Sequence, residues 1–367
     1  ALLEDWLRDY YFAAEIDLGG SGVEDYAWGE LRRLVDLPDH ELDGLVLCDG
    51  RPTGGLELRR AVAERWGNGD PDWVLTSHGS SEAIYLVLNS LLRPGDEVVV
   101  PAPMYFAFPS IAEAIGCRVR EWPLRPADGF AADIAEACRL IGPRTRMVVA
   151  NFPHNPTGSL IGPAELAELT EAAARVGAYL LWDGALAELV YDEPALPPPV
   201  LAYDRAIALG TFSKAYGLPG LRFGWCLADP AVLASLLPLR DRMTLHLSPL
   251  VELVARAVVE RAGVLLAPRL AQASRNRLLV AAWAARHADL LDLVPPRGGV
   301  TAFPRLPRVD DVRKFCRRLA DERAVLLVPG DCFGFPDRVR LGFGGPTAAV
   351  AAGLGHLAEL LVDEALA

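Results

Sequence analysis

The chain has 367 residues, of which 51% are hydrophobic and 23% are charged, so it is long enough for two hydrophobic cores and we expect two domains. Its formal net charge of -12 argues against nucleic acid or an anionic membrane as a partner, because both attract a basic face. The sequence contains no apolar run long enough to span a membrane, no signal-peptide pattern at its start and no Cys-x-x-Cys pair. We therefore expect a cytoplasmic protein with reduced, mostly buried cysteines and no metal site.

Short apolar segments alternate with helical segments along the first two thirds of the chain. The first forty residues contain Gly and Ser and are predicted to be irregular, as an arm or an active-site loop, and Pro194–Val200 is predicted to be a surface loop. Continuous apolar strands separated by helices predict a mostly parallel sheet covered on both faces. The predicted strands are Trp73–Thr76, Asp96–Val100, Arg118–Trp122, Arg146–Ala150, Ala178–Trp182, Ala206–Leu209 and Phe223–Leu227, and the predicted helices between them are Ser80–Leu92, Ile111–Ile115 and Pro163–Val176.

The pattern changes after Pro249. Two long helical stretches are followed by short strands and a closing helix from Ala348, which predicts a smaller α+β domain. The helical stretches are Val251–Ala262 and Ala271–His287, and the strands lie near Val300–Pro304, Ala324–Val328 and Arg338–Leu341. We expect an N-terminal arm and active-site loop at 1–40 that packs with the small domain, a large domain at 41–248 and a small C-terminal domain at 249–367.

The twelve residues from Thr211 to Arg222 carry the sharpest chemical pattern. Lys214 stands between small residues and precedes a Gly- and Pro-containing turn. A site for pyridoxal 5'-phosphate (PLP) needs an amine that reaches the cofactor aldehyde, and the hydroxyls of Thr211 and Ser213 with the guanidinium of Arg222 can grip the phosphate. A solvated surface Lys or Arg would explain either cation alone, but it does not explain the whole segment.

Three further segments fit the same chemistry. Asn151–Gly158 follows a buried strand, at the end where open α/β sheets bind ligands. Asp183 ends the next strand and needs a cation if it is buried, which a protonated pyridine nitrogen supplies; the alternative is a helix N-cap. Thr76–Glu82 leads into a helix whose N-terminus can bind phosphate, and the alternative there is a capping box.

The order of these motifs resembles the aspartate-aminotransferase superfamily, the fold-type I PLP enzymes, over essentially the whole chain. The resemblance implies an α/β fold with a large domain built on a mostly parallel seven-stranded sheet, a smaller C-terminal α+β domain, and a homodimer. It implies that Lys214 is the Schiff-base lysine and general base and that Asp183 pairs with the ring nitrogen. It further implies that Asn155 donates to the ring 3-oxygen and that Tyr105 stacks on the ring. The residues that it implies hold the phosphate end are Gly79, Ser80, Ser81, Thr211, Ser213 and Arg222. Arg340 is implied to bind the substrate carboxylate, and the alternative for Arg340 is a surface charge at a strand edge.

Two positions depart from the usual aminotransferase pattern. Leu186 stands where a Tyr usually follows the pyridine-pairing Asp, and Asp49 stands where a phosphate-binding Tyr is usual. Asp49 is predicted to face a cation, either a substrate guanidinium or a nearby Arg such as Arg51. With the segment that contains Ser21 and Gly22, which are predicted to bind substrate, these departures resemble the branch of capreomycidine synthases and streptolidine-forming arginine cyclases.

That branch implies a cyclase that acts on a β-hydroxylated arginine and makes capreomycidine or a streptolidine precursor in antibiotic biosynthesis. Lys214 removes the Cα proton, the β-hydroxyl leaves, and the substrate's own guanidine adds to Cβ. A conventional aminotransferase is the alternative, and a degenerate PLP-binding regulator is a third reading that the complete set of motifs disfavours. His154 and His78 are candidate acids for the leaving hydroxyl or structural histidines, and Glu15, Glu24 and Asp25 are candidate guanidinium ligands or exposed surface charges.

Overall fold

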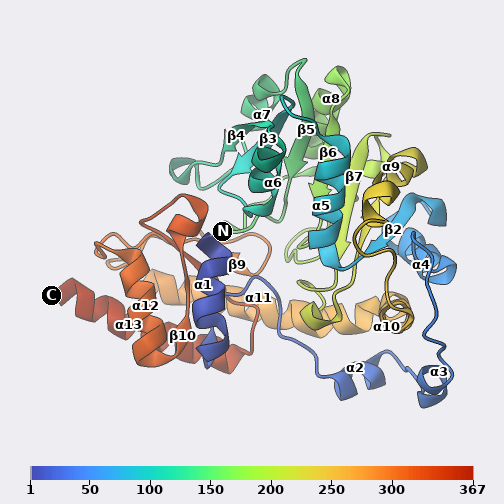
Figure 1. Ribbon diagram of the computed structural model, residues 1–367. Helices are drawn as coiled ribbons and strands as arrows, with labels where there is room; N and C mark the ends of the chain where they lie inside the picture. Colours follow the sequence, from blue (N-terminus) through green and yellow to red (C-terminus); the bar gives the residue numbers. More distant parts are fainter. Residues whose placement is uncertain (1, 367) are drawn as a thin grey trace.

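A seven-stranded sheet forms the centre of the larger part of the molecule in the computed structural model, which describes residues 2–366 (Figure 1). Its strand order is β2-β8-β7-β6-β5-β3-β4, and only β8 runs antiparallel to its neighbours. The strands are β2 Val74–Ser77, β3 Glu97–Ala102, β4 Arg118–Pro123, β5 Thr145–Ala150, β6 Tyr179–Asp183, β7 Ala206–Thr211 and β8 Gly224–Leu227. The prediction of a mostly parallel seven-stranded sheet is confirmed.

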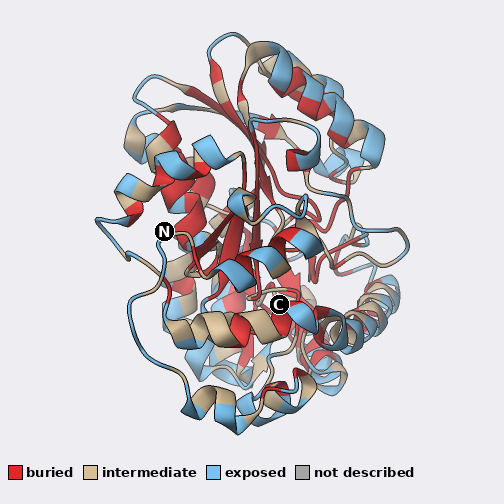
Figure 2. Cartoon of the chain, turned by 90° about the vertical axis from the view of Figure 1, so that its right-hand side faces the viewer, coloured by how far each residue is buried: buried red, intermediate tan, exposed pale blue. Residues whose placement is uncertain are grey.

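The sheet is buried because apolar side chains project from both of its faces into the two apolar clusters. In β3, Val98 and Val100 pack into one apolar cluster and Val99 packs into the other, as the two-residue period of a strand requires. Figure 2 shows the strands as the most buried layer, with the exposed residues on the outer helices and loops. Only the edge strand β4 is largely accessible to solvent.

Helices cover the two faces of this sheet. Between its strands lie α5 Gly79–Leu91, α6 Ala107–Ile115, α7 Ile134–Leu140 and α8 Pro163–Val176, while α4 Leu56–Trp66 precedes it and α9 Pro230–Arg240 follows it. The bounds of α8 are those predicted, because Pro163 at the first helical position starts the helix and Gly177, with a φ of +69°, ends it. Short 3-10 helices are η1 Tyr11–Ala13, η2 Pro71–Trp73, η3 Pro126–Asp128, η4 Pro199–Leu201, η5 Pro219–Leu221 and η6 Gly330–Phe333.

The C-terminal part combines long helices with two small sheets. The helices are α10 Pro249–Glu260, α11 Ala262–Arg286, α12 Val312–Arg323 and α13 Thr347–Leu366, and the strands are β9 Thr301–Ala302, β10 Val325–Leu326, β11 Val328–Pro329 and β12 Val339–Gly342. The single strand predicted at 324–328 is divided. Its first half pairs with β1 Ile16–Asp17, and its second half pairs with β12 in the antiparallel sheet β11-β12-β9.

The prediction that the first forty residues are irregular is wrong. Three helices form there, namely α1 Leu2–Tyr10, α2 Trp28–Leu34 and α3 Asp39–Asp43. α1 lies against the C-terminal part of the molecule (Figure 1), where it packs on β11 and η6. Its Trp6 is buried and donates from Nε1 to the Leu327 carbonyl at 2.8 Å. The N-terminal segment therefore packs on the C-terminal part through α1 and β1. The domain boundaries, with an N-terminal arm at 1–40, a large domain at 41–248 and a small domain at 249–367, stay predictions.

The cysteines are less buried than predicted. All six are free thiols, but only Cys226 and Cys316 are buried, and Cys48 is exposed in the extended segment between α3 and α4. Among residues 2–366, no helix combines the length and the apolar character that crossing a bilayer requires.

Candidate active site

A cavity of about 220 Å³ lies where the carboxyl ends of β5, β6 and β7 meet. Parallel strands bring their carboxyl ends to one edge of the sheet, so loops that are distant in sequence converge there. Ten of the predicted site residues lie on its wall, namely Ser21, Ser80, Ser81, Tyr105, Asn155, Asp183, Ser213, Lys214, Arg222 and Arg340. Gly79, Thr211 and Gly22 do not line it.

Lys214 follows β7 and projects into this cavity. Its Nζ donates to the Ser21 hydroxyl at 2.9 Å, which explains why Ser21 lies in the site. Burial and, to a smaller extent, the neighbouring Arg340 lower the pKa of Lys214 to about 8, whereas Asp183 opposes the shift. A larger fraction of this amine is therefore neutral near pH 7 than for an ordinary lysine, which suits a nucleophile or a general base.

Asp183 is the last residue of β6 and is 6% exposed. Its carboxylate accepts hydrogen bonds from Asn151 Nδ2 at 3.1 Å and from the Ala185 amide at 3.1 Å. Burial raises the pKa of Asp183 to about 6, although the Ala185 hydrogen bond and Lys214 pull it down. Within residues 2–366 no cation lies at ion-pair distance from this buried carboxylate, which fits a cation in the cavity, such as a protonated ring nitrogen.

Asn151 is a site residue that the sequence reasoning did not single out. Its Oδ1 accepts from the Asn155 amide at 3.1 Å while its Nδ2 holds Asp183, so it sets the positions of both residues. The available signal was its place directly after β5, beside the strand that ends in Asp183. Within residues 2–366 the Asn155 Nδ2 group makes no hydrogen bond, and it remains available to a ligand.

The N-terminus of α5 and the turn after Lys214 form a narrow cradle. Gly79 has a φ of +71°, and a Cβ there would lie 2.6 Å from Arg222 Nη2, so only glycine fits. Arg222 Nη1 lies 3.4 Å from the Ser213 hydroxyl. Thr211 is buried behind this cradle, with its hydroxyl 3.0 Å from that of Ser213, so it positions Ser213 and does not reach the cavity. Helix N–H groups, hydroxyls and a guanidinium are the donors that a phosphate requires.

Arg340 lies at the opposite end of the cavity, on β12. Its Nε and Nη2 donate to the Gly19 carbonyl, at 3.1 and 2.6 Å, and its Nη1 lies 3.4 Å from Asn155 Oδ1. It is 3% exposed, so the alternative of a surface charge is wrong. No carboxylate of residues 2–366 forms a salt bridge with it, and burial lowers its pKa to about 10. This uncompensated cation suits a substrate carboxylate.

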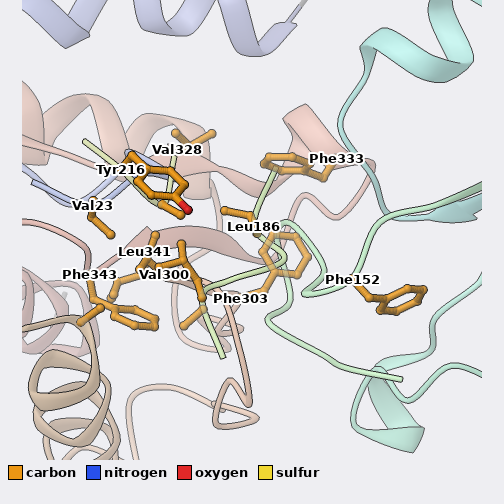
Figure 3. Packing of buried hydrophobic residues seen from close by; sticks show 14 of the residues in the cluster. Val23, Phe152, Leu186, Tyr216, Val300, Phe303, Val328, Phe333, Leu341 and Phe343 are labelled. Atoms are coloured by element: carbon orange, nitrogen blue, oxygen red, sulfur yellow. The ribbon is translucent and has the colours of Figure 1, made fainter. Parts of the chain in front are cut away.

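The two departures from the aminotransferase pattern lie in different surroundings. Leu186 lines the cavity and belongs to the apolar cluster that also contains Phe303 and Phe333 (Figure 3). An apolar side chain on the cavity wall therefore stands where the aminotransferase pattern has a phenol. Asp49 is fully exposed, and its nearest basic group is not Arg51, as expected, but His246, whose Nε2 lies 3.3 Å from Asp49 Oδ1.

The two histidines named as acids for the leaving hydroxyl are not on the cavity wall. His154 is buried with its Nδ1 2.7 Å from the Thr157 hydroxyl, and burial lowers its pKa to about 4. His78 Nδ1 lies 2.9 Å from the Glu82 carboxylate. The cavity wall instead includes Glu4 of α1, which was missed because α1 itself was not predicted.

The comparisons with known proteins agree with this geometry. The family model for aminotransferase class I and II matches residues 43–357. Capreomycidine synthase from Streptomyces vinaceus is 48% identical over 363 residues, which cover 98% of this chain and 93% of the relative. The arginine–pyruvate transaminase AruH from Pseudomonas aeruginosa is 31% identical over 77% of this chain and 73% of its own length.

Two solved structures are also similar over nearly the full chain. The PLP-dependent cyclase OrfR superposes with a TM-score of 0.94 at 42% identity, covering 99% of this chain and 97% of OrfR. A PLP-dependent aminotransferase from Streptococcus suis superposes with a TM-score of 0.93 at 29% identity, covering 98% and 97%. The chain therefore belongs to the aminotransferase class I and II family of PLP-dependent enzymes.

Proposed function

We propose that this chain is a PLP-dependent cyclase that acts on a β-hydroxylated arginine and forms capreomycidine or a streptolidine precursor. The observation that carries the proposal is the 48% identity to capreomycidine synthase over 98% of the chain. The apolar Leu186 at the expected phenol position supports it, because the cavity differs there from the ordinary aminotransferase pattern.

The residues of the cavity fit the cofactor. Lys214 would hold its aldehyde carbon, Asp183 its ring nitrogen and Asn155 its ring oxygen, with Tyr105 beside the ring. Ser80, Ser213 and Arg222 would hold its phosphate in the cradle at the start of α5. When bound, PLP supplies an electron sink that stabilises negative charge at the substrate Cα.

The chain's own groups then account for the remaining work. Arg340 holds the substrate carboxylate, and Lys214, with its lowered pKa, takes the Cα proton and later returns it. The Cβ–O bond breaks, and the departing hydroxyl takes up a proton and leaves as water. A guanidine nitrogen of the same molecule bonds to Cβ and loses its proton, so the net change is the loss of one water. Holding both reacting groups in one bound molecule contributes about 7 kcal/mol or more.

A second candidate function is supported by one comparison. The relative AruH, named as an arginine–pyruvate transaminase, is 31% identical over 77% of this chain. A transaminase would use the same Lys214 and Arg340 but would release a 2-oxo acid and retain the amino group for transfer. This alternative keeps arginine as the substrate and changes only the reaction.

Incubation of the holoenzyme with 3-hydroxyarginine, without any 2-oxo acid, separates the two functions. We expect mass spectrometry to show a product that has lost one water. L-arginine, which has no β-hydroxyl, and the Lys214→Ala variant are the controls, and neither yields that product. A parallel incubation with added pyruvate or 2-oxoglutarate detects amino transfer. If no dehydrated product forms in the first incubation and the amino group passes to the 2-oxo acid in the second, the cyclase proposal is wrong and the transaminase is correct.

We also propose that the chain forms a homodimer. The segment between α3 and α4 exposes Val46 at 71% and Leu47 at 75%, next to Asp49. Adjacent exposed apolar side chains on an extended segment are typical of a surface that another chain covers. Sedimentation equilibrium measures the mass directly. We expect twice the chain mass for the wild type and a weaker dimer for Leu47→Asp.

A further inference from the structure

A second cavity of about 490 Å³ adjoins the first, and the two share Ser21, Lys214 and Arg340. Its walls come from the chain between α1 and α2 and from the segment after β12. Four carboxylates line it, namely Glu15, Asp17, Glu24 and Asp25. A cavity that contains the reacting lysine therefore extends into an acidic region.

The partners of these carboxylates differ. Glu24 is already neutralised, because its Oε2 lies 3.2 Å from Arg269 Nη1 and 2.7 Å from Gln272 Nε2. Asp17 uses Oδ1 to accept from the amides of Gly19 and Gly20, both at 2.7 Å.

Asp17 Oδ2 and the Asp25 carboxylate remain unpaired within residues 2–366. Both side chains are exposed to solvent at the cavity wall, and Asp17 Oδ2 lies close to Gly20, where a Cβ would be 2.6 Å away. Asp25 makes no side-chain hydrogen bond, and its pKa is raised, first by burial and then by the charge of Asp17. Two neighbouring carboxylates thus face the cavity without a protein cation hydrogen-bonded between them.

A buried guanidinium on the wall of the same cavity is a second observation that points to a ligand. Arg340 is 3% exposed and carries a positive charge without a carboxylate partner in the described part of the chain. An occupant must therefore place a carboxylate at Arg340, an amine at Lys214 and positive charge at Asp17 and Asp25. That is the charge pattern of an amino acid with a cationic side chain.

We propose that Asp17 and Asp25 bind the guanidinium group of the substrate and set the preference for arginine-type amino acids. A planar guanidinium has five donors and can bridge two carboxylates, which a compact ammonium does less well. This proposal rests on the proposed function only in placing an amino acid between Arg340 and Lys214. To that function it adds Asp17 and Asp25 as the residues that select the side chain of the substrate.

Equilibrium binding to the holoenzyme tests this without relying on turnover. Changes in cofactor absorbance report the affinity for L-arginine and for L-citrulline, which has the same shape but a neutral side chain. We expect the wild type to bind arginine at least tenfold more tightly than citrulline. Asp17→Asn and Asp25→Asn should each lower arginine affinity about tenfold and leave citrulline affinity within about twofold.

Asp9→Asn is the matched control, because Asp9 is exposed on α1, lines neither cavity, and loses the same charge. It should keep the wild-type preference. Asn at position 17 retains the oxygen that the Gly19 and Gly20 amides need, and an unchanged cofactor spectrum confirms that each variant is folded. The proposal is overturned if the wild type binds arginine and citrulline with equal affinity, or if it binds lysine more tightly than arginine. It is also overturned if the variants lose affinity for arginine and for citrulline equally.

The failure of this proposal and that of the cyclase are distinguishable. Neither arginine nor citrulline has a β-hydroxyl, so their binding does not depend on cyclisation. If 3-hydroxyarginine loses no water but the arginine preference disappears in Asp17→Asn, the guanidinium site stands and the cyclase does not. If water is lost and the preference is unaffected by both variants, only the cyclase stands.

Discussion

Asn151 Nδ2 lies 3.1 Å from the Oδ2 atom of Asp183, and this hydrogen bond joins the ends of two adjacent strands. The same amide holds the backbone of Asn155 through its oxygen. One side chain thus positions both residues that we propose contact the cofactor ring. The position of the Asp183 carboxylate in the cavity therefore depends on Asn151.

Asn151→Ala should weaken cofactor binding about tenfold, because Asp183 loses a donor that stabilises its charged form. Fluorescence or absorbance titration of the cofactor-free protein with PLP measures the affinity. Asn89→Ala is the matched control, since Asn89 bonds only to the Tyr85 carbonyl on α5. Equal affinities of the Asn151 variant and the wild type would contradict the role given to this amide.

Lys214 should be the only lysine that reduction with borohydride links to PLP. The chain contains two lysines, Lys214 and Lys314, so peptide mapping by mass spectrometry assigns the adduct without ambiguity. Lys214→Ala should abolish both the adduct and the visible absorbance of bound cofactor, whereas Lys314→Ala should keep both. An adduct on Lys314 in the wild type would refute the assignment.

The stability of the cofactor-free protein should depend on pH through Asp183. Its pKa is raised from 3.8 to about 6 in the folded protein, so folding favours its protonated form. This contribution is fully present below pH 3.8 and is lost as the pH rises through 6, with a total of about 3 kcal/mol. Urea unfolding at several pH values should show that Asp183→Asn removes this loss. Parallel pH curves for the two proteins would show that the carboxyl titrates normally.

Arg340→Leu should lower the affinity for L-arginine about tenfold to a hundredfold, because the substrate carboxylate loses a charged donor. Agmatine, which lacks the carboxylate, should bind wild type and variant alike. The comparison separates loss of a specific contact from damage to the site. Arg305→Leu, on the surface, serves as the control and should leave both affinities unchanged.

Trp6→Ala should release α1 from the site. Loss of a buried indole in α1 costs about 3 to 5 kcal/mol of docking free energy. Hydrogen exchange should therefore become more than a hundredfold faster in α1 but stay slow in β5, β6 and β7. Trp28→Ala, in the exposed part of α2, should change exchange little. Unchanged protection of α1 would mean that the helix does not depend on Trp6.

The sheet and most of the cavity could be predicted from the sequence because their signals are local. The buried strands are continuous apolar runs, and the bounds of α8 follow from Pro163 and Gly177. Lys214, Asp183 and Asn155 stand directly after such strands, and a parallel sheet brings strand ends together whatever the details of the loops.

The missed features depend on contacts between distant segments. In α1 the apolar residues Leu3, Trp6 and Leu7 recur at helical spacing, so the helix itself has a local signal, but its place in the molecule does not, because Trp6 finds its partner 321 residues away. The position of Glu4 on the cavity wall follows from that docking, so no pattern around Glu4 in the sequence indicates it. Of the two readings given for His154, the structure favours a structural histidine, because the side chain is buried and its Nδ1 lies 2.7 Å from the Thr157 hydroxyl.

The contact between Arg340 and Gly19, also 321 residues apart, has a consequence for biosynthesis of the protein itself. A nascent chain can fold its seven-stranded sheet once β8 has left the ribosome, but β12 emerges more than a hundred residues later. Until then the loop that carries Ser21 has no β12 to hold it against Lys214. The cavity around Lys214 is therefore completed late, when β12 meets the segment that follows α1, after the sheet that carries Lys214 has been synthesised.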